Sequence, residues 1–251
     1  RIRGVCGPAD DPIELLERLP AGGQGGVVAD GPLEGLEGFR GIALRDQLAL
    51  PVLPLVVPNY PPLATAIRPR VSRDTVEVVY CGVLGRGQNL PMILRSVPQW
   101  PANVRLTLIG DDTTGLAQSL RAQVAQAGLD DRVTFTGWLD LADLPARLAQ
   151  ADLGICLLDD RPAQFRTALS ACNKRYQYMQ AGLAQIGDRN PGVAGLLQDN
   201  SIGRCIHDYT PQAIATLVRH YASDRTTLMA DGARAAALHQ SRFNYQAAAA
   251  P

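Results

Sequence analysis

The stretch VEVVYCGVLGRGQNLPMILRSVPQWPANVRLTLIG, residues 76–110, decides the fold. It starts with a β-branched run, passes through a glycine-containing turn into an amphipathic segment of helical length, and ends in a second apolar run. This order predicts a strand, a helix and a second strand. Because two parallel strands need a crossover connection, the stretch indicates a βαβ unit.

The same alternation continues to about residue 240. Strands are predicted at residues 76–82, 104–110, 133–136, 152–158, 183–186 and 203–206. Helices are predicted at residues 89–97, 114–127, 141–149, 174–181, 193–198, 211–221 and 224–239. Helical crossovers cover both faces of a parallel sheet, so the pattern predicts an α/β fold, a doubly wound parallel sheet with its ligand crevice at the carboxyl ends of the strands.

Residues 1–70 differ in composition from the rest. Residues 20–41 are rich in glycine and poor in core residues, and prolines cluster at residues 51–69, a composition that favours an extended connector with one short strand at 55–57. We therefore predict an incomplete N-terminal segment and connector over residues 1–70, with a boundary near residues 60–75, and a Rossmann-like domain over residues 71–251. Since the chain starts at Arg1 and not at Met, we expect a fragment or a processed form of a longer protein.

Composition restricts the function classes. Of the 251 residues 46% are apolar, and the formal net charge is zero, so no global field attracts nucleic acid and no nucleic-acid partner is expected. Sequence inspection finds neither a bilayer-spanning apolar stretch nor a signal peptide, although a peripheral contact at the inner membrane face stays open.

Cysteine and histidine usage restricts the redox compartment and the metal content. The five cysteines form no CxxC pair, which favours a reduced, cytoplasmic protein in which Cys81 and Cys156 pack as small apolar residues. His207, His220 and His239 are far apart and have no ligand spacing to the cysteines, so no metal site is expected.

The turn after the first predicted strand is the first candidate site. Gly82, Gly85 and Gly87 let a ligand approach the backbone, the following helix offers its N-terminal amides, and Arg86 adds a positive charge. These groups suit a diphosphate, although a plain strand-to-helix turn with Arg86 on the surface is an equal alternative. The spacing lacks both GxGxxG and GxxxxGK, which argues against a dinucleotide-dependent dehydrogenase and a P-loop ATPase.

Three further features follow along the predicted crevice. Gly110 permits close approach at the end of the second strand, while Asp111 and Asp112 are expected to cap the next helix. Trp138 lies in a turn where it either contacts a nucleobase or anchors the core. The acidic loop at residues 159–161 either contacts a donor sugar or is a solvated loop.

These pieces occur in one order: GRG, LIGDD, VTFTGW, AQADLGICLL, NKRYQYMQAGLAQIG, NPGVAGLL and IGRCI. Over residues 52–240 that order resembles the carboxyl-terminal, nucleotide-sugar-binding domain of retaining GT-B glycosyltransferases of group 1, the glycogen-synthase-like type. The resemblance implies transfer of a sugar from a nucleoside diphosphate sugar to an unknown saccharide, lipid or small-molecule acceptor, with retention, without a cofactor, and in polysaccharide biosynthesis.

The resemblance also assigns roles to residues. It implies that Arg86 and Lys174 hold the donor diphosphate and carry catalysis, and that Gln177 stands where the family usually has a glutamate for the donor ribose. Gly82, Gly85, Gly87, Gly110 and Trp138 complete the expected donor site. Leu169 replaces the second family glutamate, and Ala184 and Gln185 replace a proline-apolar turn.

These departures leave two alternatives open. One is a non-catalytic glycosyltransferase-like module that binds or scaffolds a partner, since the acidic residues and the acceptor domain are missing. The other is an epimerase or phosphorylase on the same fold, for which no pyridoxal phosphate lysine and no acidic or histidine cluster is evident.

Overall fold

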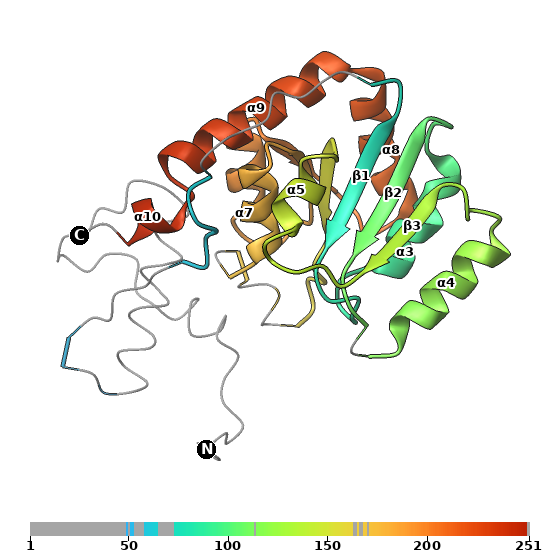
Figure 1. Ribbon diagram of the computed structural model, residues 1–251, viewed down its shortest axis with the longest axis horizontal. Coiled ribbons are helices and arrows are strands. Elements are labelled where there is room, and N and C mark those ends of the chain that lie inside the picture. The colour runs from blue at the N-terminus through green and yellow to red at the C-terminus, as the bar shows by residue number, and fades with distance from the viewer. Residues whose placement is uncertain are drawn as a thin grey trace.

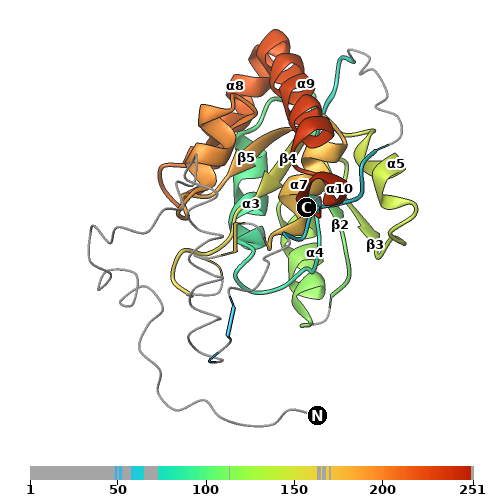
Figure 2. The same cartoon turned by 90° about the vertical axis from the view of Figure 1, so that its left-hand side faces the viewer.

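A computed structural model describes residues 49, 51–52, 58–64, 73–112, 114–162, 165, 168–169 and 171–249. In this part of the chain six strands form one sheet, with helices on both faces (Figure 1, Figure 2). The strands are β1 (Val76–Cys81), β2 (Val104–Ile109), β3 (Val133–Gly137), β4 (Leu153–Cys156), β5 (Ala184–Gly187) and β6 (Gly203–Cys205). All pairs are parallel, in the order β3-β2-β1-β4-β5-β6, which confirms the predicted doubly wound sheet.

The helices of the described residues divide between the two faces. They are α3 (Leu90–Ser96), the 3-10 helix η1 (Val97–Gln99), α4 (Leu116–Gln126), α5 (Leu144–Leu148), α7 (Asn173–Gln180), the π-helix η2 (Gly195–Asp199), α8 (Pro211–Ser223), α9 (Arg225–Ser241) and α10 (Tyr245–Ala248). Helices α3, α4 and α8 pack on one face. Helices α5 and α7 cover the other, and α9 lies against α7 and β5.

The central strand β1 shows why the strands are apolar throughout. Val78 and Tyr80 belong to the core under α3 and α8, whereas Val79 and Cys81 belong to the core under α5 and α7. Successive side chains of a strand point to opposite faces, so a sheet covered on both sides needs apolar residues at every position.

All six predicted strands and all seven predicted helices overlap an element of the structure. The segment predicted as a helix at 193–198 forms the π-helix η2 instead of an α-helix. The short helix α10 was not predicted; the Asn244 side chain caps it by accepting a hydrogen bond from the amide of Ala247 at 2.8 Å. The predicted strand at 55–57 lies outside the described residues, as does most of the predicted N-terminal segment.

A buried ion pair fixes α7 to the sheet. The guanidinium of Arg175 donates to the carboxylate of Asp188, and both side chains are almost inaccessible, with exposed fractions of 1% and 0%. The same carboxylate accepts the amides of Leu158 at 2.9 Å and Asn190 at 3.0 Å. One aspartate thus ties the helix to the segments that follow β4 and β5.

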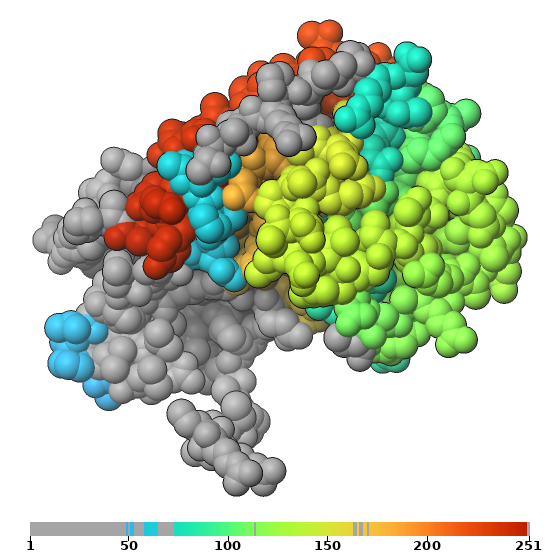
Figure 3. All heavy atoms as spheres, in the orientation of Figure 1, coloured from blue at the N-terminus to red at the C-terminus, as the bar shows by residue number. Residues whose placement is uncertain are grey.

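Residues 58–64 lie against α7, α9 and α10, and are cyan in Figure 3 beside the red α10. The ring of Tyr60 packs on Tyr176 and Phe243, with centroids 4.3 and 5.6 Å apart. His239 is fully buried: its Nε2 accepts the amide of Ala64 at 3.2 Å, and its Nδ1 lies 2.9 Å from the carbonyl oxygen of Phe243. These two bonds require a neutral ring with its proton on Nδ1.

The ion pair generates a first prediction. Asp188→Asn leaves the Arg175 charge buried without its counter-ion, and we expect a loss of about 3–5 kcal/mol in the free energy of unfolding. Urea titration followed by circular dichroism measures the loss. The control is Asp160→Asn, which breaks the more exposed pair with Arg189 and should cost about 0–1 kcal/mol. Equal losses in the two variants would contradict the structural role of Asp188.

The second prediction concerns pH. Burial lowers the pKa of His239 below its ordinary value of about 6.5, so the unfolded chain binds more protons than the folded one as the pH falls below that value. The stability that the neutral ring provides is therefore present above about pH 6.5 and is lost as the pH falls toward the folded pKa. Urea titrations over this range should show wild type losing its advantage over His239→Gln. A difference that does not change with pH would contradict the prediction.

Candidate functional site

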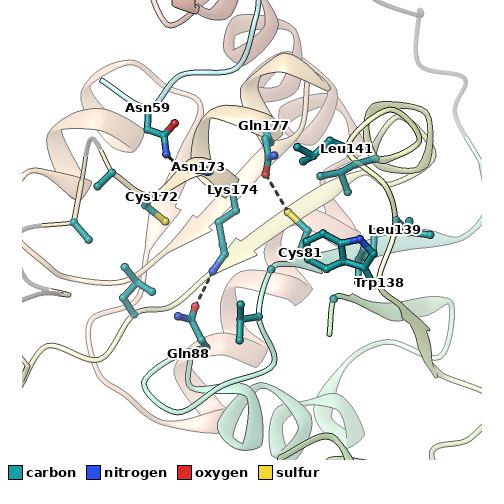
Figure 4. A pocket seen from close by; sticks show the side chains of 18 of the residues that line it. Asn59, Cys81, Gln88, Trp138, Leu139, Leu141, Cys172, Asn173, Lys174 and Gln177 are labelled. Atoms are coloured by element: carbon teal, nitrogen blue, oxygen red, sulfur yellow. Dashed lines mark hydrogen bonds between the residues drawn. The ribbon is translucent and has the colours of Figure 1, made fainter. Parts of the chain in front are cut away.

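A pocket of about 560 Å³ opens at the carboxyl ends of the strands, where the sequence predicted the ligand crevice. Its walls come from the ends of β1 and β2, the segments after β3 and β4, and the first half of α7 (Figure 4). The strand order reverses at the pair β1 and β4, so the loops after these strands diverge and leave a crevice between them.

Five of the eight predicted site residues line this pocket: Gly82, Gly110, Trp138, Lys174 and Gln177. Gly85, Arg86 and Gly87 are not among the lining residues, although Gln88, the next residue along the chain, is. The side chain of Arg86 is exposed and makes no hydrogen bond or ion pair with the part of the chain that the structure describes. Its predicted contact with a diphosphate stays a prediction.

Glycines at and after the strand ends allow other parts of the chain to approach closely. Gly110 has a φ of 148°, and a Cβ atom there would lie 1.8 Å from the carbonyl oxygen of Gly82. Gly87 has a φ of 80°, and a Cβ there would lie 2.1 Å from the ring of Phe165. Contacts within the chain thus explain both positions without a ligand: with backbone at Gly110 and with an aromatic side chain at Gly87.

Lys174 is the only lysine among the 251 residues, which otherwise carry 23 arginines. Its ammonium donates to Oε1 of Gln88 at 2.7 Å and to the hydroxyl of Tyr80 at 3.4 Å, and it lies 4.7 Å from the centre of the Tyr80 ring. No carboxylate of the described chain lies within ion-pair distance of it. Burial by itself lowers the pKa of Lys174, but interactions with Tyr80 and the cysteines raise it overall, so the group is charged at neutral pH.

The partners of Lys174 are neutral. Burial raises the pKa of Tyr80 to about 12, and its hydroxyl donates to the carbonyl oxygen of Val83 at 2.7 Å. The Gln88 side chain carries no charge. A positive charge whose hydrogen-bond partners are neutral, and which has no carboxylate of the described chain beside it, favours an anionic ligand in a partly enclosed pocket.

Tyr178 positions the lining residues of α7. Its hydroxyl accepts the amide of Cys81 at 3.1 Å and donates to the carbonyl oxygen of Ile155 at 3.1 Å, so it connects β1 to β4. A Cβ on Gly154 would lie 2.4 Å from the Tyr178 ring, which shows how closely the helix approaches the sheet. The adjacent Gln177 points into the pocket, where its Oε1 lies 3.7 Å from the Sγ of Cys81.

The rim of the pocket is apolar and exposed. Trp138 is 62% exposed, and Leu141 and Val83 are also exposed. Trp138 is therefore not the core anchor of the alternative interpretation, and its indole face is free to contact a ligand.

Sequence reasoning did not assign a role to several pocket residues, among them Gln88 and Asn173, nor to Tyr80, which contacts Lys174 from β1. Gln88 and Asn173 are each next to a residue or motif that was predicted, and this adjacency was the available signal. Asn173 meets Asn59 of the connector in a short hydrogen bond between their side-chain amides, a contact across 114 positions that no local pattern reveals.

The acidic residues near the pocket have structural partners. Asp112 accepts the amides of Leu116 at 2.9 Å and Ala117 at 2.7 Å, which confirms that it caps α4. Asp159 pairs with Arg161 at 2.9 Å, and Asp160 pairs with Arg189 at 2.7 Å.

The altered family positions are occupied by core residues. Leu169 is buried, and its carbonyl oxygen accepts the hydroxyl of Tyr176 at 3.2 Å. Ala184 and Gln185 form the start of β5, where the side-chain amide of Gln185 donates through Nε2 to the carbonyl oxygen of Arg175 at 3.0 Å. The strand thus forms although the family's proline is missing.

The described residues show neither a candidate metal site nor a candidate membrane span. No group of three or more His, Cys, Asp or Glu side chains there is arranged to hold a metal ion. None of the helices in these ranges combines the length and the apolar character that crossing a membrane requires.

Solved structures share this fold. An Anabaena protein, Alr3699/HepE, in complex with UDP-glucose superimposes with a TM-score of 0.60 at 20% identity, over 82% of this chain and 49% of its own. Sucrose-phosphate synthase from Thermosynechococcus elongatus gives 0.58 at 19%, over 82% and 46%. The C-terminal domain of LpcC, a group 1 family glycosyl transferase from Francisella tularensis, gives 0.55 at 17%, over 67% and 86%.

The chain thus spans about half the length of the first two structures and most of the isolated C-terminal domain. No curated protein matches the chain. The family model for glycosyl transferases group 1 matches residues 75–224, well over half of the 251 residues, and covers the whole sheet and the pocket walls from β1 to α7. The chain therefore belongs to the group 1 glycosyl transferases.

Proposed function

We propose that this chain is the donor-binding part of a glycosyltransferase that moves a sugar from a nucleoside diphosphate sugar to an acceptor, with retention at the anomeric carbon. The observation that carries the proposal is the Lys174 ammonium, which faces a 560 Å³ pocket and whose hydrogen-bond partners in the described chain, Gln88 and Tyr80, are neutral. The complexes of Alr3699/HepE with UDP-glucose and with UDP support a nucleoside diphosphate as the anion.

Lys174 would act through charge. When the bond between the anomeric carbon and the diphosphate oxygen breaks, negative charge grows on the leaving diphosphate. A nearby ammonium stabilises that charge, and the apolar rim weakens its screening by water. Arg86 would add a second positive charge from the loop before Gln88, and Gln177 would bind the donor ribose through its side-chain amide.

The remaining parts of the donor site follow from position. Gly82 and Gly110 form the floor at the strand ends, while Trp138 stands at the rim, where an indole can stack on a nucleobase. Gly85 and Gly87 would shape the loop that carries Arg86. No cofactor and no metal enters this scheme.

The acceptor would be bound elsewhere in a longer protein. The chain spans about half of the Alr3699/HepE and sucrose-phosphate synthase structures, so we propose that residues beyond this chain supply the acceptor site, for a saccharide, a lipid or a small molecule. We place the protein in the cytoplasm and in polysaccharide biosynthesis, with a peripheral membrane contact where the acceptor is a lipid.

A second candidate function is a non-catalytic binding or scaffolding module. It is favoured by Gln177 and by the buried Leu169, which occupy the two positions where the resemblance leads us to expect glutamates. Such a module would keep the pocket but bind a donor weakly.

UDP binding tests the main proposal. We expect UDP to raise the melting temperature, and Lys174→Ala to weaken UDP binding roughly tenfold to a hundredfold, because a charge-assisted hydrogen bond contributes about 1.5–3 kcal/mol. Isothermal titration calorimetry measures the dissociation constant. Arg95→Ala, which removes an exposed cation at the end of α3, is the control and should leave binding unchanged. Arg86→Ala tests the second cation separately and should also weaken binding.

The single lysine allows a direct check of where UDP binds. An amine-reactive ester can modify only Lys174 and the chain's amino terminus, and UDP should protect Lys174 alone. Unchanged labelling of Lys174 at saturating UDP, or no UDP binding at millimolar concentration, would overturn the proposal.

Gln177→Glu distinguishes the two candidate functions. A carboxylate accepts hydrogen bonds from a ribose more strongly than an amide does. If the site binds a donor, we therefore expect Gln177→Glu to bind UDP-glucose roughly tenfold more tightly than wild type does. Gln126→Glu on the exposed side of α4 adds the same charge away from the pocket and is the control. No gain in affinity would favour the scaffolding module.

A further inference from the structure

Two cysteines meet beside the pocket although they are 16 positions apart in the sequence. The Sγ atoms of Cys156, at the end of β4, and Cys172, directly before α7, are 3.5 Å apart. Cys172 lines the pocket and is visible in Figure 4, whereas Cys156 lies beneath it with an exposed fraction of 1%. A small molecule in the pocket therefore reaches Cys172 first.

At this distance the two sulfurs are in direct contact but not bonded. A disulfide has an S–S length of about 2.05 Å, so the sulfurs need to approach by about 1.5 Å. Side-chain rotation at the two cysteines, with a small shift of the residues before α7, is the movement that closes such a gap. Both thiols are free in the structure.

The charges around the pair differ for its two members. A hydrogen bond from Cys156 and the positive charges of Arg175 and Lys174 lower the pKa of Cys172, although burial opposes them. Burial raises the pKa of Cys156. These charges favour ionisation of Cys172 over Cys156, so Cys172 is the attacking sulfur of the pair and Cys156 is the thiol that resolves its oxidised form.

We propose that Cys172 and Cys156 form a modification site for small hydroperoxides, which enter the pocket and oxidise the two thiols to a disulfide. The Cys172 thiolate attacks the terminal oxygen of the hydroperoxide; the O–O bond breaks, a sulfenic acid forms, and the leaving alkoxide takes a proton to become an alcohol, or water from hydrogen peroxide. Cys156 then loses its proton and attacks the Cys172 sulfur, which forms the S–S bond and expels hydroxide. In sum two thiols are oxidised by two electrons, the hydroperoxide is reduced, and an alcohol and water are released.

The other described cysteines lack this arrangement. Burial raises the pKa of Cys81 to about 11, and its Sγ lies against Gln177. Burial also raises the pKa of Cys205, to about 12, and this residue is not among those lining the pocket. Neither has a thiol partner of its own within hydrogen-bonding distance in the described chain.

The disulfide would also act on the donor site, an effect that rests on the proposed function. Cys172 directly precedes Asn173, and Lys174 and Gln177 follow within the same helix. Pulling Cys172 toward β4 shifts the first turn of α7, so the ammonium and the amide that face the pocket lose their positions. Bound UDP, in turn, would shield Cys172 from the hydroperoxide.

The test treats the folded chain with hydrogen peroxide, alkylates the remaining free thiols, and maps the cysteines by peptide mass spectrometry. We expect one crosslink, between the peptides of Cys156 and Cys172, which dithiothreitol reverses. It should form equally in Cys205→Ser and be absent from Cys172→Ser. In Cys156→Ala the resolving thiol is missing, so Cys172 should accumulate as a sulfenic acid that the probe dimedone traps.

Specific outcomes would overturn the proposal. One is that both thiols stay free at a peroxide concentration that oxidises free cysteine. A second is that the main crosslink involves Cys6 or Cys81. A third is that the Cys156–Cys172 crosslink forms only in urea. The dimedone adduct keeps the test valid even if Cys172→Ser does not fold, since it needs only Cys156→Ala.

UDP affinity tests the effect on the donor site. Oxidation should raise the dissociation constant by roughly tenfold or more, and dithiothreitol should restore it. Equal UDP affinity of the reduced and oxidised forms would overturn the effect on binding. If the reduced chain does not bind UDP while the crosslink still forms, the proposed function fails and the thiol chemistry stands.

Discussion

The buried pair between Arg175 and Asp188 is the interaction on which the pocket depends. Two charges removed from water must face one another, so they fix the distance between α7 and the segments after β4 and β5. Asp188 also accepts the backbone amides of Leu158 and Asn190, so the same carboxylate holds the helix and both segments. The positions of Lys174 and Gln177, on either side of Arg175, follow from this constraint.

A single electrostatic feature underlies both chemistries inferred for the pocket. The hydrogen-bond partners of the Lys174 ammonium are neutral, and no carboxylate of the described chain lies beside it to cancel its field. That field favours a diphosphate and also lowers the pKa of the Cys172 thiol. A bound diphosphate and the Cys172 thiolate would thus interact with the same positive charge. Oxidation of the thiols would therefore change the affinity of the donor site.

Much of the fold was predictable because it depends on local patterns. The strands are apolar at every position since helices cover both faces, and Asp112 precedes α4 as a cap residue should. Gly82 and Gly110 were predicted as places where a ligand approaches the backbone, but the structure shows that the two strand ends approach one another there. A glycine pattern indicates that another group approaches the backbone closely. It does not distinguish a ligand from another segment of the chain.

Adjacent residues of α7 show the limit of the sequence. The chain determined that NKRYQYM forms a helix beside the sheet, because apolar residues recur at helical spacing and a glycine follows. Helical spacing alone does not separate Lys174 from Arg175; the family resemblance singled out Lys174, and the structure shows that Lys174 lines the pocket while Arg175 is buried against Asp188. The sequence also did not bring Cys156 to Cys172 or keep Arg86 out of the pocket wall. Those outcomes depend on where distant segments meet, and only the packing of helices on the twisted sheet sets that.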